Sequence, residues 1–142
     1  MVNLNFDNII VTPLKKIHVE GGDVFHCMKK SNIGFNGFGE AYFSFADYLS
    51  IKAWKKHKLM TLNLVVPIGE INFVFYTEDF TRYKSIIIGA SSYCRITVPP
   101  GFWFGFQGLS KNGNLLLNLA DIEHVPEESD RIDIQNLYYN WK

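Results

Sequence analysis

The stretch IKAWKKHKLMTLNLVVPIGEINFVFY, residues 51–76, decides the fold class. In its first part, Ile51 to Lys58, the side chains alternate in character with a period of two, and Leu62 to Val66 forms a short apolar run. The segment Pro67-Ile68-Gly69-Glu70 is typical of a turn, from which Ile71 to Tyr76 runs back. A period of two is the signature of a strand, since successive strand side chains point to opposite faces. The stretch therefore predicts consecutive strands joined by a turn.

The same pattern continues on both sides of this stretch. Turns are indicated at Gly21-Gly22-Asp23, Asn36-Gly37 and Pro99-Pro100-Gly101, and short helical pieces at Glu78 to Tyr83 and Glu127 to Arg131. Strands spaced by about 8–12 residues favour a sandwich or barrel. We predict an all-β fold, a jelly-roll barrel in which residues 1–142 form a single domain. The remaining strands are expected at Ile9–Val19 with a bend at Pro13, Val24–Met28, Gly39–Ala46, Ser85–Ile88, Tyr93–Val98, Phe102–Phe106 and Asn114–Leu119.

Composition excludes several classes of function. The chain has fourteen basic and fourteen acidic residues and no basic stripe, which argues against nucleic-acid binding. No apolar run approaches the roughly 18 residues of a membrane span, and no signal-peptide pattern opens the chain, so we expect a cytoplasmic protein without membrane contact. The two cysteines, Cys27 and Cys94, have neither metal-ligand nor redox spacing and are expected to be small core residues.

Four segments, at residues 22–25, 51–76, 98–106 and 118–128, carry a resemblance to a known family. The second resembles the central strand pair of the dTDP-4-dehydrorhamnose 3,5-epimerases, and VPPGFWFGF at 98–106 is similar to their motif of two prolines, glycine, an aromatic pair and Gly-Phe. The resemblance implies a homodimeric cupin that binds a nucleoside-diphosphate sugar inside its barrel. It also implies proton removal next to a 4-keto group, without a metal or organic cofactor.

Many cupins bind a metal through three histidines and an acid, and the sequence lacks most of these ligands. The first pair of ligands would fall on Lys55 and His57, and the third histidine on Phe104. Met60 and Thr61 stand where an acid is needed. A single imidazole cannot hold a divalent ion, since such sites need about three protein ligands. We therefore expect no metal.

Acid–base chemistry next to a ketone needs a base, an acid and a donor for the enolate oxygen. Alternation places Ile51, Ala53, Lys55 and His57 on one face, expected to be the barrel interior. Desolvation and mutual repulsion should lower the pKa of Lys55 and of His57, so either one suits the base and the other the donor. The resemblance places the family's catalytic histidine at Lys55 and its acid tyrosine at His124, which makes Lys55, His57 and His124 the candidate catalytic residues.

The substrate-binding candidates are mostly cations and aromatic residues. Lys52 stands in the place of the family's arginine, but alternation turns it outward, so this position requires a local bulge or a contribution from a partner subunit. Lys58 and Arg95 are alternative cations for the diphosphate. The family's enolate-side lysine falls at the uncharged Asn63. Trp54, Trp103 and Phe104 are candidates for stacking on a base or sugar, and Asn118 completes the set.

The predicted function is that of a nucleotide-sugar epimerase or isomerase acting on a dTDP- or UDP-linked 4-keto-6-deoxy sugar in bacterial surface-polysaccharide biosynthesis. Because the family's histidine, tyrosine and lysine positions are replaced, a non-catalytic cupin that binds a sugar nucleotide or glycan is the alternative. Mutation of Lys55 or His57 separates the two. The aromatic C-terminus, Leu137 to Trp141, is expected to pack on the barrel or on a partner subunit.

Overall fold

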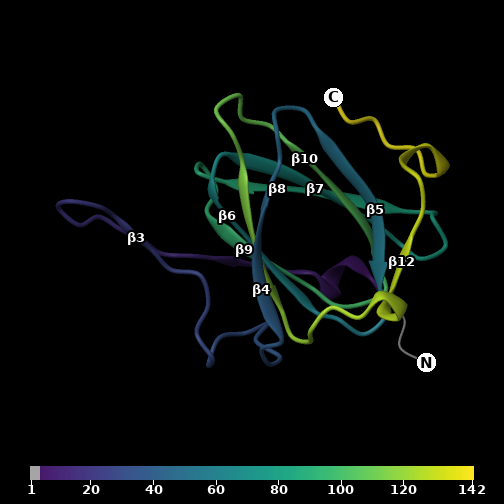
Figure 1. The fold of residues 1–142 in the computed structure, drawn as a ribbon, viewed down its shortest axis with the longest axis horizontal. Coiled ribbons are helices and arrows are strands. Elements are labelled where there is room, and N and C mark those ends of the chain that lie inside the picture. The colour runs from purple at the N-terminus through teal and green to yellow at the C-terminus, as the bar shows by residue number, and fades with distance from the viewer. Residues whose placement is uncertain (1–3) are drawn as a thin grey trace.

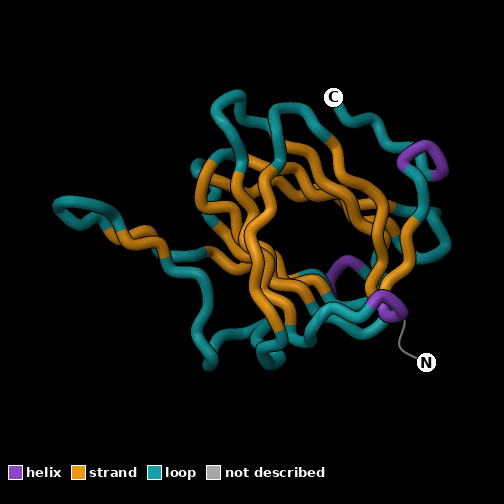
Figure 2. Tube along the Cα trace, in the orientation of Figure 1, coloured by secondary structure: helices purple, strands orange, loops and turns teal. Residues whose placement is uncertain are grey.

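The computed structural model describes residues 4–142, and nearly all of its regular structure is β-strand, as predicted (Figures 1 and 2). Within these residues no helix is long and apolar enough to cross a membrane. Three short 3-10 helices are η1 (Phe6–Asn8), η2 (Pro126–Glu128) and η3 (Ile134–Asn136). The strands are β1 (Ile10–Pro13), β2 (Lys16–Ile17), β3 (Val24–Phe25), β4 (Glu40–Phe45), β5 (Ile51–His57), β6 (Leu62–Ile68), β7 (Glu70–Tyr76), β8 (Tyr83–Gly89), β9 (Cys94–Val98), β10 (Trp103–Gly108), β11 (Leu115–Ala120) and β12 (Ser129–Arg131).

Two five-stranded antiparallel sheets form the barrel. The first sheet has the order β1-β9-β6-β11-β4 and the second β12-β5-β10-β7-β8. Apolar side chains from the inner faces of both sheets make one core cluster, which includes Leu64, Phe73, Phe75, Ile96 and Leu116. This arrangement confirms the predicted cupin jelly roll.

The predicted opening strand, Ile9 to Val19, is divided in two. β1 pairs with β9 and ends at Pro13, whose ring nitrogen cannot donate to a ladder. β2 pairs only with β3, and Figure 1 shows this hairpin projecting from the barrel as an arm. We call residues 16–25 the arm.

The two predicted helical pieces are mostly wrong. Residues 77–82 form a turn, in which the Asp79 carboxylate accepts hydrogen bonds from the hydroxyls of Thr77 and Thr81, both at 2.7 Å. The second piece is a single 3-10 turn that ends at Glu128, after which β12 pairs with β5. A strand replaces the expected helix here because the β5 edge offers backbone partners that a short polar segment cannot supply to itself.

A β-bulge interrupts β5 where it pairs with β10. Lys55 pairs with Phe104 and Lys52 with Phe106, so Ala53 and Trp54 together face the single residue Gly105. A bulge inverts the alternation on one side of it. Lys52 therefore joins Lys55 among the cavity-lining residues, as the sequence required for its predicted role. Ala53, expected to face inward, packs against the outer cluster described next and also borders the cavity.

The C-terminal segment packs on the barrel, over the outer face of the second sheet. The indole Nε1 of Trp54 donates to the Leu137 carbonyl at 3.0 Å, and the Tyr76 hydroxyl to the Tyr138 carbonyl at 2.6 Å. The strand side chains beneath it are buried. These strand side chains and Leu137 of the C-terminal segment form a second apolar cluster. We call it the tail cluster; its members are Trp54, Val74, Tyr76, Trp103 and Leu137.

Candidate functional site

The inner face of β5 opens onto a cavity of about 460 Å³, which is within the size range of small-molecule sites. Its cations are Lys52, Lys55 and Arg131, and among the described residues no carboxylate lines it. A cation-lined space walled by aromatic rings favours an anionic organic ligand. The lining residues are Tyr42, Ser44, Ile51, Lys52, Ala53, Trp54, Lys55, His57, Phe104, Phe106, Asn118, Arg131 and Ile134.

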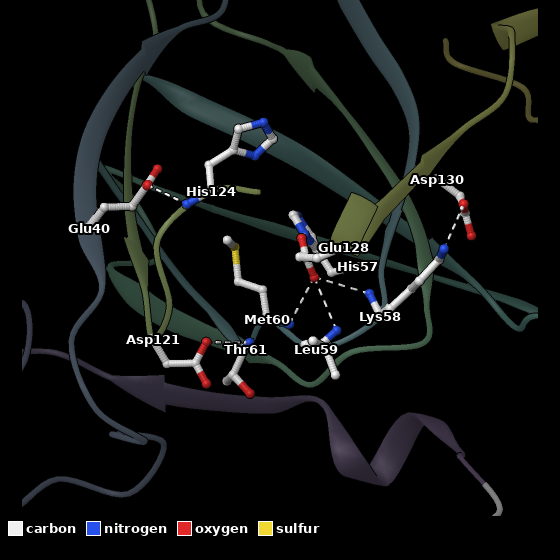
Figure 3. Close-up of polar contacts among 10 residues, drawn as sticks. All are labelled: Glu40, His57, Lys58, Leu59, Met60, Thr61, Asp121, His124, Glu128 and Asp130. Carbon is white, nitrogen blue, oxygen red and sulfur yellow. Dashed lines mark hydrogen bonds and ion pairs between the residues drawn. The ribbon is translucent and has the colours of Figure 1, made fainter. Parts of the chain in front are cut away.

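A buried histidine–carboxylate pair lies beside this cavity (Figure 3). His57, at the end of β5, is 4% exposed, and Glu128, at the end of η2, is 5% exposed. The Nδ1 atom of His57 is hydrogen-bonded to Oε1 of Glu128. Phe104 stacks on the imidazole with ring centroids 6.0 Å apart. The hydrogen bond to Glu128 at its edge and the stacked Phe104 at its face therefore hold the imidazole in one orientation.

Glu128 is held in its ionised form. Its second oxygen, Oε2, accepts backbone N–H bonds from Lys58 at 3.2 Å and from Leu59 and Met60 at 3.0 Å (Figure 3). Burial opposes ionisation, but the hydrogen bonds from His57, Leu59 and Met60 outweigh it and lower the pKa of this carboxyl. An ionised carboxylate accepts only, so Nδ1 of His57 carries the shared proton.

His57 consequently offers Nε2 as a free proton acceptor. Nε2 has no hydrogen-bond partner within residues 4–142. Burial lowers the pKa of His57, and the positive charges of Lys55 and His124 add to this, while Glu128 acts in the opposite direction. A lowered pKa keeps the ring neutral at physiological pH, which is the state that a general base requires.

Two further titratable groups line the cavity. Burial lowers the pKa of Lys55, assisted by the positive charge of Arg131. Burial, followed by the negative charge of Glu40, raises the pKa of Tyr42, so its phenol stays protonated. The cavity thus holds a neutral histidine, a lysine side chain and a phenol, a set able to remove a proton, stabilise the resulting negative charge and return the proton.

His124 lies in the exposed loop after β11 rather than among the cavity-lining residues. Its backbone N–H donates to Oε1 of Glu40 at 2.7 Å. In the view of Figure 3 its ring is drawn above Glu40 and the His57–Glu128 pair, with no hydrogen bond to either, and its charge lowers the pKa of His57. The structure thus places His124 near the pair without direct contact to it.

Several predicted substrate contacts are corrected by the structure. The Trp103 indole lies in the tail cluster and does not line the cavity. The Trp54 indole belongs to the same cluster, while Trp54 also borders the cavity. Lys58 is exposed, with Nζ 3.5 Å from Oδ1 of Asp130. Phe104 and Asn118 do line the cavity.

Asn63 and Arg95 lie on the outer face of the first sheet. Their strand neighbours Leu62, Leu64 and Ile96 point into the core, so alternation turns these two polar side chains away from it. The Asn63 amide donates to the Gly34 carbonyl at 3.0 Å. The prediction that Asn63 and Arg95 contact a substrate in this cavity is therefore wrong, because neither residue lines it.

The structure adds three residues that the sequence did not reveal: Glu128, Tyr42 and Arg131. Glu128 belongs to a run of polar residues, where nothing in the sequence distinguishes a buried acid from exposed ones. Tyr42 and Ser44 alternate with the exposed Phe43 and carry polar groups on the cavity side of β4. Strand alternation in this segment could have indicated that Tyr42 faces the cavity.

No three histidine, cysteine, aspartate or glutamate side chains gather as metal ligands in the part of the chain that the structure describes. His57 has its Nδ1 engaged with Glu128, and the aligned positions hold Lys55 and Phe104. The donor set at this site does not fit a cupin metal centre.

Comparison with known proteins gives matches among solved structures. No family model matches the chain, and no curated protein sequence is similar to it. A dTDP-sugar isomerase from Desulfovibrio desulfuricans G20 has a TM-score of 0.88 and 32% identity, with 95% of this chain and 91% of the other covered. The 3,4-ketoisomerase QdtA from Thermoanaerobacterium thermosaccharolyticum, solved with TDP, has a TM-score of 0.75 and 20% identity over 88% of each chain.

An epimerase shares the fold as well. The dTDP-6-deoxy-D-glucose-3,5-epimerase RmlC from Legionella pneumophila, solved with dTDP-4-keto-L-rhamnose, has a TM-score of 0.79 and 17% identity, covering 99% of this chain and 81% of the other. Identity at this level and that of QdtA establish the fold, whereas the 32% match over nearly the whole length establishes kinship. This chain belongs to the cupin family of dTDP-sugar isomerases and epimerases.

Proposed function

We propose that this protein is a nucleotide-sugar epimerase or isomerase that acts on a dTDP- or UDP-linked 4-keto-6-deoxy sugar by metal-free proton abstraction next to the ketone. The observation that carries the proposal is the neutral His57, oriented by Glu128 at the wall of a cation-lined cavity. Its catalytic set differs from that of the family, with Lys55 in place of a histidine and His124 in place of a tyrosine.

His57 is the base in this mechanism. Nε2 takes the proton from the carbon next to the ketone, and the C–H electron pair moves into the carbonyl to give an enolate oxygen. The ionised Glu128 stabilises the resulting imidazolium through Nδ1–H. The ammonium of Lys55, two residues away on the same strand, donates a hydrogen bond to the enolate oxygen. This contact stabilises the negative charge that develops in the transition state.

The proton then returns from an acid, and the position of that acid decides the product. Delivery to the opposite face of the same carbon inverts its configuration, whereas delivery to the neighbouring carbon moves the ketone. Tyr42, whose raised pKa keeps its phenol protonated, and His124 are the two candidate acids. Tyr42 lines the cavity, whereas His124 requires its loop to bring the ring inward.

The cavity-lining cations suit the diphosphate of a nucleotide sugar. The side chain of Arg131, on β12, has neither a hydrogen bond nor an ion pair with any residue of 4–142, so its guanidinium is available for bidentate contact with phosphate oxygens. Lys52 donates to the Phe45 carbonyl at 2.9 Å and lies over the Phe106 ring, from which Nζ can turn to an anion. Asn118 adds a buried amide to the same wall.

The experiment that tests the function is incubation of the purified protein in D₂O with dTDP-4-keto-6-deoxyglucose and with its UDP counterpart, followed by NMR. Deuterium wash-in at C3 or C5 with a changed coupling pattern establishes epimerisation, and appearance of a 3-keto sugar establishes ketone migration. Binding of the nucleotide sugar without wash-in or product at either carbon would support the non-catalytic alternative and contradict the proposal.

We also propose that the protein is a homodimer built through the arm. An isolated two-stranded hairpin is marginal in water, yet the arm exposes Ile17, Val19 and Val24 at 41–49%. The edge strand β4 also turns Phe43 and Phe45 outward, 63% and 71% exposed. A second copy that receives the arm would cover such apolar side chains.

Sedimentation equilibrium tests the dimer. The native chain should sediment at twice the mass of one chain, and Val24→Asp should shift the equilibrium toward the monomer, with Glu20→Lys on the same arm as control. A native chain that is monomeric at all concentrations would refute the dimer. A cytoplasmic location, expected from the sequence pattern, and a role in bacterial surface-polysaccharide biosynthesis, implied by the family resemblance, stay predictions.

A further inference from the structure

The outer face of the first sheet carries a buried cation that has no counter-charge. Arg95 is 0% exposed, and its Nη1 and Nη2 donate to the carbonyls of Cys27 at 2.6 Å and Ile33 at 2.8 Å. Its Nε–H has no acceptor, and its guanidinium no carboxylate partner, within residues 4–142. Because guanidinium stays ionised, two carbonyl dipoles alone compensate a full buried charge.

A second pocket, of about 190 Å³, lies against Arg95 at the base of the arm. Lys15, His26 and Lys29 line it together with Arg95, and none of the described lining residues is acidic. Neither lysine forms an ion pair with a carboxylate in the described chain. At about 30 Å³ for a water molecule, the pocket has room for a few waters or one small oxyanion.

This pocket is separate from the catalytic cavity. Arg95 lies on the face of β9 opposite to Ile96 and Val98, which belong to the core. The two sets of lining residues have no member in common. An anion at Arg95 would therefore occupy a site other than the one proposed for the sugar nucleotide.

We propose that this pocket binds a small oxyanion of the phosphate class. Arg95 supplies a fixed charge held by two carbonyls, with Nε–H as a free donor, and the ammonium groups of Lys15 and Lys29 supply mobile charge. Because Lys15 precedes the arm and Lys29 follows it, the anion would join the two ends of the arm to the barrel. Free phosphate and the phosphate group of a nucleotide share this chemistry.

The test follows the Nε–H resonance of Arg95 by ¹⁵N NMR, assigned with Arg95→Lys, during titration with inorganic phosphate against a sodium chloride control of equal ionic strength. A saturating shift of this resonance and of the backbone amides of residues 26–32 is expected. The double variant Lys15→Ala/Lys29→Ala should bind about tenfold more weakly, because two charge-assisted contacts are lost. The control Lys84→Ala/Lys111→Ala makes the same change of charge elsewhere and should bind as the native chain does.

Thymidine monophosphate provides the second arm of the test. A saturating Arg95 shift with phosphate identifies a free-anion site, and one with thymidine monophosphate alone identifies a nucleotide-phosphate site. Either result supports the proposal. The absence of a saturating shift with both ligands, equal affinity in the Lys15/Lys29 variant, or shifts confined to His57 and its cavity neighbours would overturn it.

Discussion

The two faces of β5 have different roles, catalysis on the inner face and stability on the outer face, although their residues alternate along one strand. On the inner face the Lys55 side chain has no hydrogen-bond partner in the described chain, and His57 keeps one ring nitrogen free. On the outer face the Trp54 indole is 1% exposed, with its N–H bonded to the tail, and Lys56 lies over Trp103 while pairing with Glu78. The polar groups of the inner face are free to contact a substrate, whereas those of the outer face are already hydrogen-bonded and stabilise the fold.

The largest difference between the two faces is expected in kcat when Glu128, the partner of His57, is replaced. In Glu128→Gln the three backbone N–H groups retain the amide oxygen, so the NH₂ group turns to His57 and forces the proton onto Nε2. A base with the wrong tautomer should lose about 10²- to 10⁴-fold in kcat. Steady-state kinetics and nucleotide titration measure this, with the exposed neighbour variant Glu127→Gln as control. Full activity in Glu128→Gln would show that His57 needs no orienting partner.

The outer face should respond in stability instead. Trp103→Ala removes a side chain that is 6% exposed and in contact with Phe80 and Lys56. We expect the free energy of unfolding to fall by about 3–5 kcal/mol, as for other buried aromatic truncations. Urea denaturation measures this loss, and kcat per folded molecule should stay near the native value. A large drop in kcat at unchanged stability would place Trp103 in the site after all.

Lys55 and its neighbour Lys56 provide a matched pair. Lys55→Met removes the donor to the enolate oxygen and should lower kcat by about 10²- to 10³-fold, the usual loss for one oxyanion donor. Lys56→Met alters the outer face, where the lysine pairs with Glu78 at 3.2 Å, and should leave kcat unchanged. Kinetics of both variants at saturating substrate make the comparison. Equal effects would mean that β5 does not divide its functions by face.

The smallest effect concerns pH. Because burial lowers the pKa of His57, kcat/KM should fall with decreasing pH only below the ordinary histidine value of about 6.5. His124→Gln removes a positive neighbour, so this limb should move slightly upward in pH, and kcat should be retained where Tyr42 is the acid. A pH–rate profile of both proteins tests this. A collapse of kcat in His124→Gln would instead identify His124 as the acid and exclude Tyr42 from that step.

Most strands could be predicted because alternation and Gly/Pro turns are local signals. β4 to β11 lie close to their expected positions, and Lys52 reached the cavity through the bulge that its role required. The outward position of Ala53 could not be predicted, since it depends on a bulge at which Ala53 and Trp54 together face Gly105 of the neighbouring strand. Local patterns carry no information about such a partner.

The site was harder to predict than the fold. His57 and Lys55 were recognisable from their strand position, and the structure brings both to one cavity. Glu128 was not, because a polar run such as residues 127–131 reads as solvated until η2 turns one carboxylate under the barrel and onto three backbone N–H groups. Arg95 was misplaced for a related reason, since a charged strand residue is assigned to a cavity more readily than to a loop-covered outer face.

The central claim is that His57 removes the proton next to the ketone. Its most direct measurement is the rate of solvent deuterium wash-in into dTDP-4-keto-6-deoxyglucose at saturating enzyme, compared between the native chain, His57→Gln and the arm variant His18→Gln. We predict rapid wash-in for the native chain and for His18→Gln, and a rate lower by about 10²- to 10⁴-fold for His57→Gln with nucleotide binding retained. Wash-in at the native rate in His57→Gln would contradict it.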